Sequence, residues 1–297
     1  MRRQRNQPRS FAMLIGAMFI YGSVGIFRRY IPVTSGLLSL IRGILGALFL
    51  LVLIKLTKRR LIPGADRKTK LLLVVSGAFI GFNWILLFES YNYTSVPTAT
   101  LCYYLEPSIV MLVSPLLFKE KLGLKKGLCA AASFVGMVLV SGIAETGLPS
   151  ASEIKGILLG IGAALLYSAV VILNKKLGDT EPFSRTFIQL CSAAVVVFPY
   201  VLTAEDITKL PCDARSLILT AVLGIVHTGI AYALYFGAIG GLRTQTTAIF
   251  SYVDPITAVV LSFVILHERL SLPALVGAVI MLASAIISVV GDEISED

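Results

Sequence analysis

The chain has 297 residues, of which 56% are hydrophobic and 14% are charged. A soluble domain carries roughly 25% charged residues, so this composition indicates a chain whose surface faces lipid, with little length left for a soluble enzyme or sensor domain. The formal charge of +9 is explained by basic loops that orient membrane helices, which argues against a nucleic-acid-binding surface.

Ten apolar segments follow one another along the chain. Each is close to the length of about 20 residues that a membrane-spanning helix needs. Their apolar character is continuous and does not alternate, so they are predicted to be helices rather than strands. In chain order the predicted spans are 10–28, 34–56, 70–89, 94–118, 124–143, 154–174, 184–203, 215–237, 243–266 and 272–291.

The Lys and Arg residues are distributed unequally between the two sides of these spans. With the N-terminus inside, the inner segments hold 19 of them and the outer segments hold 6, while Arg42 lies within a span. Cytoplasmic loops of membrane proteins carry an excess of Lys and Arg. We therefore expect an integral protein of the bacterial cytoplasmic membrane with both termini in the cytoplasm.

The two halves of the chain are related in sequence. Residues 81–122 align without gaps on residues 229–270, so that Glu106 and its following proline recur as Asp254 and its following proline. A duplication of this kind predicts two units with the same helix order.

The predicted units are residues 1–143 and residues 154–297, joined by an external linker over 144–153. Each unit would hold five spans, and because five is odd, the second unit enters the membrane from the opposite side. The predicted fold is therefore an all-α integral membrane protein with ten transmembrane helices, arranged as two inverted five-helix repeats. Inverted repeats are typical of transporters.

Two segments of the second half carry a family resemblance: TAIFSYVDPI at 247–256 and LHERL at 266–270, the latter recurring as FKEKL at 118–122. With the two five-helix halves, they resemble the EamA family of the drug/metabolite transporter superfamily over nearly the whole chain. The resemblance implies ten helices, both termini inside, and export or uptake of small metabolites such as amino acids. Glu106 departs from the family pattern, in which the position before this proline is often small or apolar.

Glu106 and Asp254 are the strongest candidates for a transport site. An ionisable side chain at mid-membrane costs about 2.5–3.5 kcal/mol on insertion scales, so it points to function. Each of the two lies near the middle of a predicted span and precedes a proline, which disfavours helical geometry in that residue. We expect a kinked helix whose carboxylate binds a cation or exchanges a proton. The alternative is that each carboxylate only pairs with a neighbour, such as Arg42, and locks the helices.

Three further ionisable residues are candidates. Arg42, in the second span, would bind a substrate carboxylate through two hydrogen bonds, or it would neutralise Glu106 permanently. His227 would relay protons, or a neighbouring hydroxyl group would satisfy it. Glu89 lies near the outer end of the third span.

Aromatic side chains gather in the same spans. Tyr103 lies three residues before the carboxylate of the fourth span, on roughly the same helical face. Tyr103, Tyr104 and Trp84 are predicted to lie too deep for an interfacial aromatic belt, and Tyr252 occupies the repeat position of Tyr104. These rings would bind a cation through their faces or stack on an aromatic ring. Asn83, beside Trp84, would add a polar contact.

The sequence contains no motif of a known energy-converting or catalytic site. It has no GxxxxGK[ST] loop for ATP, and no HExxH, GxSxG or His cluster. No enzyme activity and no cofactor are therefore expected. The cysteines have no CxxC spacing, so neither a disulfide nor a metal site is predicted; they are Cys102, Cys129, Cys191 and Cys212.

These observations predict a secondary active transporter of a small metabolite, either an amino acid or an amine-like solute. It would export this solute by alternating access around a midplane site, although only the resemblance indicates the direction. The alternatives are a proton-coupled importer of a cationic solute and a transport-inactive membrane scaffold or receptor. The expected partners are a small-molecule substrate, a proton and the lipid bilayer, with no nucleic acid. The chain is expected to be a monomer or a homodimer.

Overall fold

The computed structural model describes residues 7–59, 66–118, 123–141, 149–177, 180–205, 213–239, 242, 247 and 250–290. Every regular element within these ranges is a helix. The motif residue Glu120 and Cys212 lie outside the described residues. In chain order the helices are α1 (Gln7–Arg29), α2 (Ser35–Leu56), α3 (Arg67–Tyr93), α4 (Val96–Tyr103), α5 (Glu106–Phe118), α6 (Leu124–Val140), α8 (Ala151–Leu177), α9 (Pro182–Ala204), α10 (Ala214–Gly224), η2 (Ile225–Ile230), α11 (Ala231–Ile239), α13 (Val253–Leu261), η3 (Ser262–Leu266) and α14 (Leu272–Val290).

Seven helices among the described residues are long and apolar enough to cross a membrane. The α4–α5 segment counts as one of them, and so does the α10–η2–α11 segment. The other predicted spans correspond to α6, to the α13–η3 segment and to α14, which are shorter or less apolar. Helices therefore lie at all ten predicted segments, while ten membrane crossings stay a prediction.

Helices in the two halves begin at matching positions with matching caps. Asp66 and Asp213, 147 residues apart in the sequence, accept hydrogen bonds of 2.9 Å from the backbone N–H groups of Thr69 and Ser216. These bonds satisfy amide groups that the start of a helix leaves free, and they lower the pKa of both aspartates. The starts of α2 and α9, and those of α5 and α13, are also 147 residues apart.

The helix at Glu106 is interrupted rather than kinked. α4 ends at Tyr103, the turn residues Tyr104 and Leu105 follow, and α5 begins at Glu106. In the second half, α13 begins at Val253. Because a proline is tolerated in the first turn of a helix and not in its interior, the prolines after the two carboxylates fit new helix starts.

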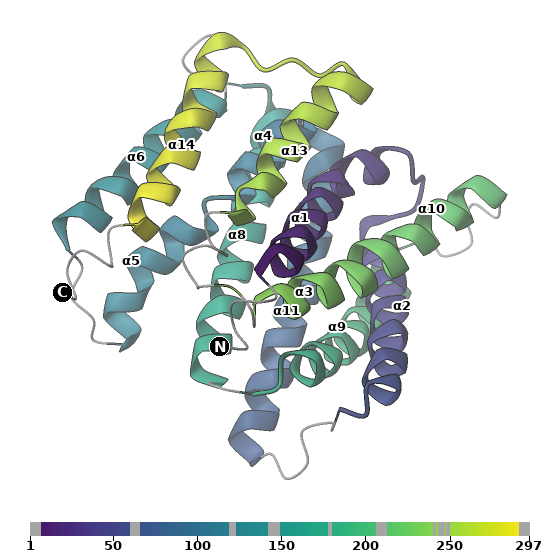
Figure 1. The fold of residues 1–297 in the computed structure, drawn as a ribbon. Coiled ribbons are helices and arrows are strands. Elements are labelled where there is room, and N and C mark those ends of the chain that lie inside the picture. Colours follow the sequence, from purple (N-terminus) through teal and green to yellow (C-terminus); the bar gives the residue numbers. More distant parts are fainter. Residues whose placement is uncertain are drawn as a thin grey trace.

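The packing contacts between helices are also related between the two halves. α3 packs against α8 and α9, and the α10–η2–α11 segment packs against α1 and α2. α1 packs on α13 just as α8 packs on α4 and α5. α2 pairs with α9, and α6 pairs with α14 at one edge of the molecule (Figure 1). When α1–α6 are matched in order with α8–α14, each of these contacts has an equivalent contact in which the two halves are exchanged. The α2–α9 and α6–α14 contacts are their own equivalents. A two-fold relation between the halves would require this pattern.

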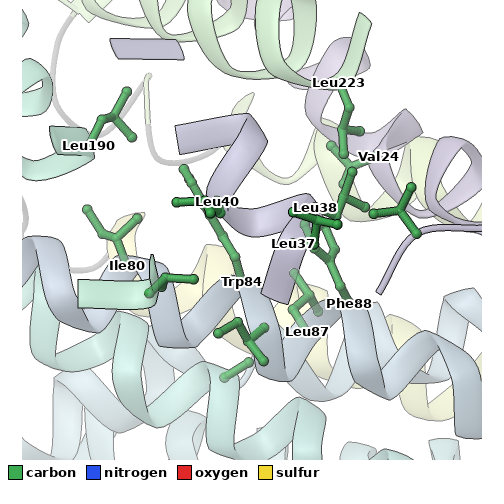
Figure 2. Packing of buried hydrophobic residues seen from close by; sticks show 14 of the residues in the cluster. Val24, Leu37, Leu38, Leu40, Ile80, Trp84, Leu87, Phe88, Leu190 and Leu223 are labelled. Carbon is green, nitrogen blue, oxygen red and sulfur yellow. The ribbon is translucent and has the colours of Figure 1, made fainter. Parts of the chain in front are cut away.

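The largest buried apolar cluster lies mainly between α1, α2, α3, α9 and α10 (Figure 2). Leu38, Phe88, Leu190 and Leu223 are fully buried in it. Trp84 is also part of this cluster, so its indole ring is anchored by packing on the apolar side. The cluster joins helices of both halves.

Glu268 joins three helix ends on the face that the charge distribution assigns to the outside. Its Oε1 accepts a hydrogen bond of 2.8 Å from Arg29 at the end of α1. Its Oε2 accepts bonds from the Val96 backbone N–H at 2.9 Å and from the Ser262 hydroxyl at 2.6 Å. The repeated Glu-Arg-Leu motif therefore supplies a carboxylate that caps α4 and braces it against α1.

The packing of α6 on α14 predicts a large difference between two glycines of the same helix. An added Cβ at Gly136 would lie 2.6 Å from the carbonyl oxygen of Gly277, whereas one at Gly127 would meet no atom within 4 Å. We expect Gly136→Ala to lower the free energy of unfolding by about 1–3 kcal/mol through overpacking. The measurement is thermal unfolding of the purified protein in detergent. Gly127→Ala is the matched control and should leave the Tm unchanged or slightly raised; equal losses in both variants would contradict this packing.

Candidate functional site

The two predicted carboxylates lie at helix N-termini inside the bundle. Glu106 is the first residue of α5, and Asp254 is the second residue of α13. Both are half-buried, and both are close enough to Tyr103 and Tyr167 to act electrostatically on their hydroxyl groups. The Tyr104 side chain also lies close to the Asp254 carboxylate. Because the N-terminus of a helix carries partial positive charge, each position favours an anion.

Each of these two helix starts is supported by a helix of the other half. The Ser168 hydroxyl on α8 donates a hydrogen bond of 3.2 Å to the carbonyl oxygen of Glu106. Gly22 on α1 lies 146 residues earlier in the sequence than Ser168, and it allows α1 to approach α13 closely. An added Cβ at Gly22 would lie 2.5 Å from the carbonyl oxygen of Asp254. A change in the relative position of the two halves would therefore change the local contacts at both carboxylates.

Tyrosine rings line the region between the two carboxylates. The ring centroid of Tyr103 is 5.9 Å from that of Tyr104 and 5.6 Å from that of Tyr167. The centroids of Tyr104 and Tyr252 are 6.5 Å apart. The structure thus brings three predicted tyrosines together with Tyr167, which the sequence analysis did not single out. Its recurrence as Tyr21 in the first half was the available signal.

Tyr21 and Tyr232 continue this cluster toward α2. Their ring centroids are 5.8 Å apart, and the buried Tyr21 hydroxyl has no hydrogen-bond partner among the described residues. An unsatisfied buried polar group costs about 1–3 kcal/mol. A group of this kind is suited to a polar ligand that enters the cluster.

Arg42 is buried and has no carboxylate partner among the described residues. Its guanidinium lies 4.3 Å from the ring centroid of Trp84 and 5.5 Å from that of Phe88. Its Nε donates a hydrogen bond of 2.7 Å to the Thr228 hydroxyl. The ion pairs among the described residues are Arg29–Glu268 and Arg59–Glu181. The pairing of Arg42 with Glu106, considered from the sequence, is therefore not formed in this conformation.

Arg42 nevertheless belongs to the tyrosine cluster. It is close enough to Tyr21, Tyr103 and Tyr232 to act electrostatically on them. Arg42, Glu106 and Asp254 therefore all lie near Tyr103. Such an arrangement suits a solute that carries both a positive and a negative group.

His227 and Asn83 make local bonds outside the carboxylate region. His227 lies in the π-helical turn η2, and its Nε2 is 2.9 Å from the Ser23 hydroxyl. The Asn83 amide donates a hydrogen bond of 2.6 Å to the carbonyl oxygen of Ala163, which joins α3 to α8. Each of the two side chains therefore has a hydrogen-bond partner within the protein. The π-helical turn was not predicted, because no sequence pattern marks it.

Glu89 lies apart from the other candidates, near the end of α3. Its Oε2 accepts hydrogen bonds from the Ser35 hydroxyl at 2.6 Å and from the Asn92 amide at 3.1 Å. It lines a cavity at the face that the charge distribution assigns to the outside.

Comparisons with known proteins agree on one family. The sequence profile of the EamA-like transporter family matches residues 9–142 and 154–290. The chain is 28% identical over 281 residues to the "Uncharacterized transporter YxxF" of Bacillus subtilis, covering 93% of this chain and 88% of that protein. It is 27% identical over 226 residues to "Protein PecM" of Dickeya dadantii, covering 73% and 72%. It is 24% identical over 202 residues to the "Probable amino-acid metabolite efflux pump" of Salmonella typhimurium, covering 65% and 67%.

A solved crystal structure has a similar fold. The TM-score is 0.70 at 16% sequence identity, and the match covers 98% of this chain and 100% of the other. At this identity the similarity establishes the fold alone.

The burial of Arg42 predicts that its replacement will not destabilise the protein. A charged side chain at mid-membrane costs about 2.5–3.5 kcal/mol, and none of the carboxylates that the structure describes lies within 4.0 Å of Arg42 to offset this cost. We therefore expect Arg42→Met, which keeps a long unbranched side chain, to leave the Tm of the purified protein unchanged or raised. Arg59→Met, which breaks the 2.7 Å ion pair with Glu181, should lower it slightly. A clear loss of stability in Arg42→Met would assign this arginine to the structure rather than to a ligand.

Proposed function

Because the chain belongs to the EamA-like transporter family over both of its halves, we propose that it is a secondary active transporter that exports an amino acid or an amine-like solute. Its transport site contains Glu106 and Asp254. The observation that supports this proposal is the placement of two carboxylates at two helix N-termini, among tyrosine rings from α4, α8, α11 and α1.

We further propose that residues 1–143 and 154–297 form two inverted repeats with ten spans, joined by the linker 144–153. The matched helix starts and the exchanged packing contacts support this arrangement. In alternating access, the two repeats rock around a site near the bilayer midplane. Glu106 and Asp254 occupy equivalent positions and would both lie at that site.

The charges of the site favour a solute with an amino group. The proposed site holds two carboxylates and one arginine, Arg42, so these groups carry an excess of negative charge. Tyrosine faces attract cations, with a contribution of about 0.5–2 kcal/mol in a desolvated site. Arg42 would bind a carboxylate of the solute through its planar pair of donors. An α-amino acid carries both groups.

Coupling to protons follows from competition at the carboxylates. A carboxylate that binds a proton cannot at the same time form an ion pair with an ammonium group. If the site without solute turns back toward the cytoplasm only when Glu106 or Asp254 is protonated, then the solute moves outward as a proton moves inward. The Salmonella typhimurium relative is named "Probable amino-acid metabolite efflux pump", which supports the outward direction.

The transport proposal is tested with purified protein in proteoliposomes. A panel of amino acids and amines is assayed for flux with and without a pH gradient. We expect Glu106→Gln and Asp254→Asn to lower the rate roughly ten- to a hundred-fold, because each removes a charge-assisted bond to the solute. The variant that removes the coupling group should also lose the dependence on the pH gradient.

Glu153→Gln is the control, since Glu153 is an exposed glutamate at the start of α8. It should transport at the wild-type rate. Unchanged flux and pH dependence in both Glu106→Gln and Asp254→Asn would refute the proposed site. Absence of any flux in the wild type, with the protein folded, would favour a transport-inactive membrane scaffold.

A further inference from the structure

A cavity of about 790 Å³ lies between the ends of α1, α2, α3 and α9. It is on the face that the charge distribution assigns to the outside, and neither Glu106 nor Asp254 lines it. We propose that this cavity is a second binding site, for the zwitterionic head of an α-amino acid, with Arg28 binding the carboxylate and Glu89 binding the ammonium group. The inference rests on the proposed transport function and adds a docking site on the path of the solute.

Arg28 is buried and uses its donors incompletely. Its side chain is 6% exposed, and it lines the cavity. Nη1 donates a hydrogen bond of 2.9 Å to the carbonyl oxygen of Ile31. Nη2 makes only long contacts, of 3.2 Å to the Ser35 hydroxyl and 3.4 Å to the Asn92 side-chain oxygen. Nε has no partner among the described residues. Since a guanidinium offers five donors in a planar fork, this one has capacity left for a carboxylate.

Glu89 offers the complementary charge. Its Oε2 is held by the Ser35 hydroxyl and the Asn92 amide, while Oε1 accepts no hydrogen bond in the described part of the chain. Ser35 and Asn92 thus touch both Arg28 and Glu89 and stand between them. The two charges are held near each other, yet they form no ion pair within 4.0 Å. A solute with both charges would bridge them.

The other charged groups at the cavity already have hydrogen-bond partners in the protein. Arg29 pairs with Glu268 at 2.8 Å and also donates to the carbonyl oxygen of Thr94. Glu205 caps the start of α2, where its two oxygens accept bonds of 2.8 Å from the backbone N–H groups of Gly36 and Leu37. Its Oε2 also accepts from the Thr34 hydroxyl at 2.6 Å. Arg28 and Glu89 are therefore the charged groups with hydrogen-bonding capacity left for a ligand.

This balance selects against solutes with a single charge. A simple anion would meet Arg28 but would be repelled by Glu89, and a simple amine would meet the opposite problem. A zwitterion satisfies both groups at once. The head group of phosphatidylethanolamine carries the same pair of charges, so the test must separate a free amino acid from a lipid.

The experiment uses the double variant Glu106→Gln/Asp254→Asn, in which the proposed transport site is disabled, embedded in phosphatidylcholine nanodiscs. Thermal unfolding is measured with a mixture of neutral L-amino acids, then with the mixture of their deaminated carboxylic acids, and then with the mixture of their decarboxylated amines. We expect stabilisation by the amino acids and none by either set of singly charged analogues.

Arg28→Gln or Glu89→Gln, added separately to this background, should weaken the apparent affinity for the amino acids roughly ten- to a hundred-fold. Arg269→Gln is the matched control, because Arg269 is exposed and lies on the same face outside the cavity. It should bind like its parent. If one of these two variants folds poorly, the other still tests the proposed site.

Three results would overturn the proposal. They are no stabilisation of the background variant by amino acids, equal stabilisation by the carboxylic acids or the amines, and binding that neither Arg28→Gln nor Glu89→Gln weakens. Nanodiscs that contain phosphatidylethanolamine separate the two sources of the zwitterion. If this lipid alone stabilises the protein in an Arg28-dependent manner and abolishes the amino-acid effect, the occupant is a lipid. Intact binding without any flux in the wild type would instead count against the transport proposal alone.

Discussion

Backbone N–H and C=O groups need partners inside the protein wherever lipid surrounds it, because the hydrocarbon region offers none. This constraint governs where a membrane-spanning helix can be interrupted. The interruption before Glu106 and the helix start near Asp254 lie against α8 and α1, which approach closely enough to bond or shield the backbone there. Because each supporting helix belongs to the opposite half, the two carboxylates are the places where a movement between the halves would change the local contacts most directly.

The two halves are also joined at the face assigned to the outside, by side chains of one half that cap helices of the other. Glu205 and Glu268, both from the second half, cap the starts of α2 and α4 in the first half. A hydrogen bond to a charged group contributes about 1.5–3 kcal/mol. Separation of the halves at this face would break several of these bonds, so it needs a compensating interaction elsewhere. Binding of the solute at the carboxylates is the compensation that our proposal supplies.

Much of the helix arrangement follows from the sequence, and the reason is physical. Continuous apolar runs of spanning length placed helices at all ten predicted segments. The Glu-Pro and Asp-Pro pairs predicted kinks at these two positions, where the structure has helix starts instead. Periodicity shows which face of one helix a residue occupies, but not which neighbour that face meets. For this reason the bond from Asn83 to the backbone of α8, and the lack of an ion pair at Arg42, required the structure.

The central claim is that the region around the two carboxylates opens to each side of the membrane in turn, and cysteine labelling tests it directly. Tyr21 and Tyr167 occupy equivalent repeat positions in this region. Tyr21→Cys and Tyr167→Cys are placed singly in a chain whose four native cysteines are serines, and a membrane-impermeant thiol reagent is applied from either side of sealed vesicles. Alternating access predicts that each cysteine reacts from both sides of the membrane. Addition of a transported solute should raise the reaction rate from one side and lower it from the other. Reaction from only one side, unaffected by any solute, would contradict alternating access at this site.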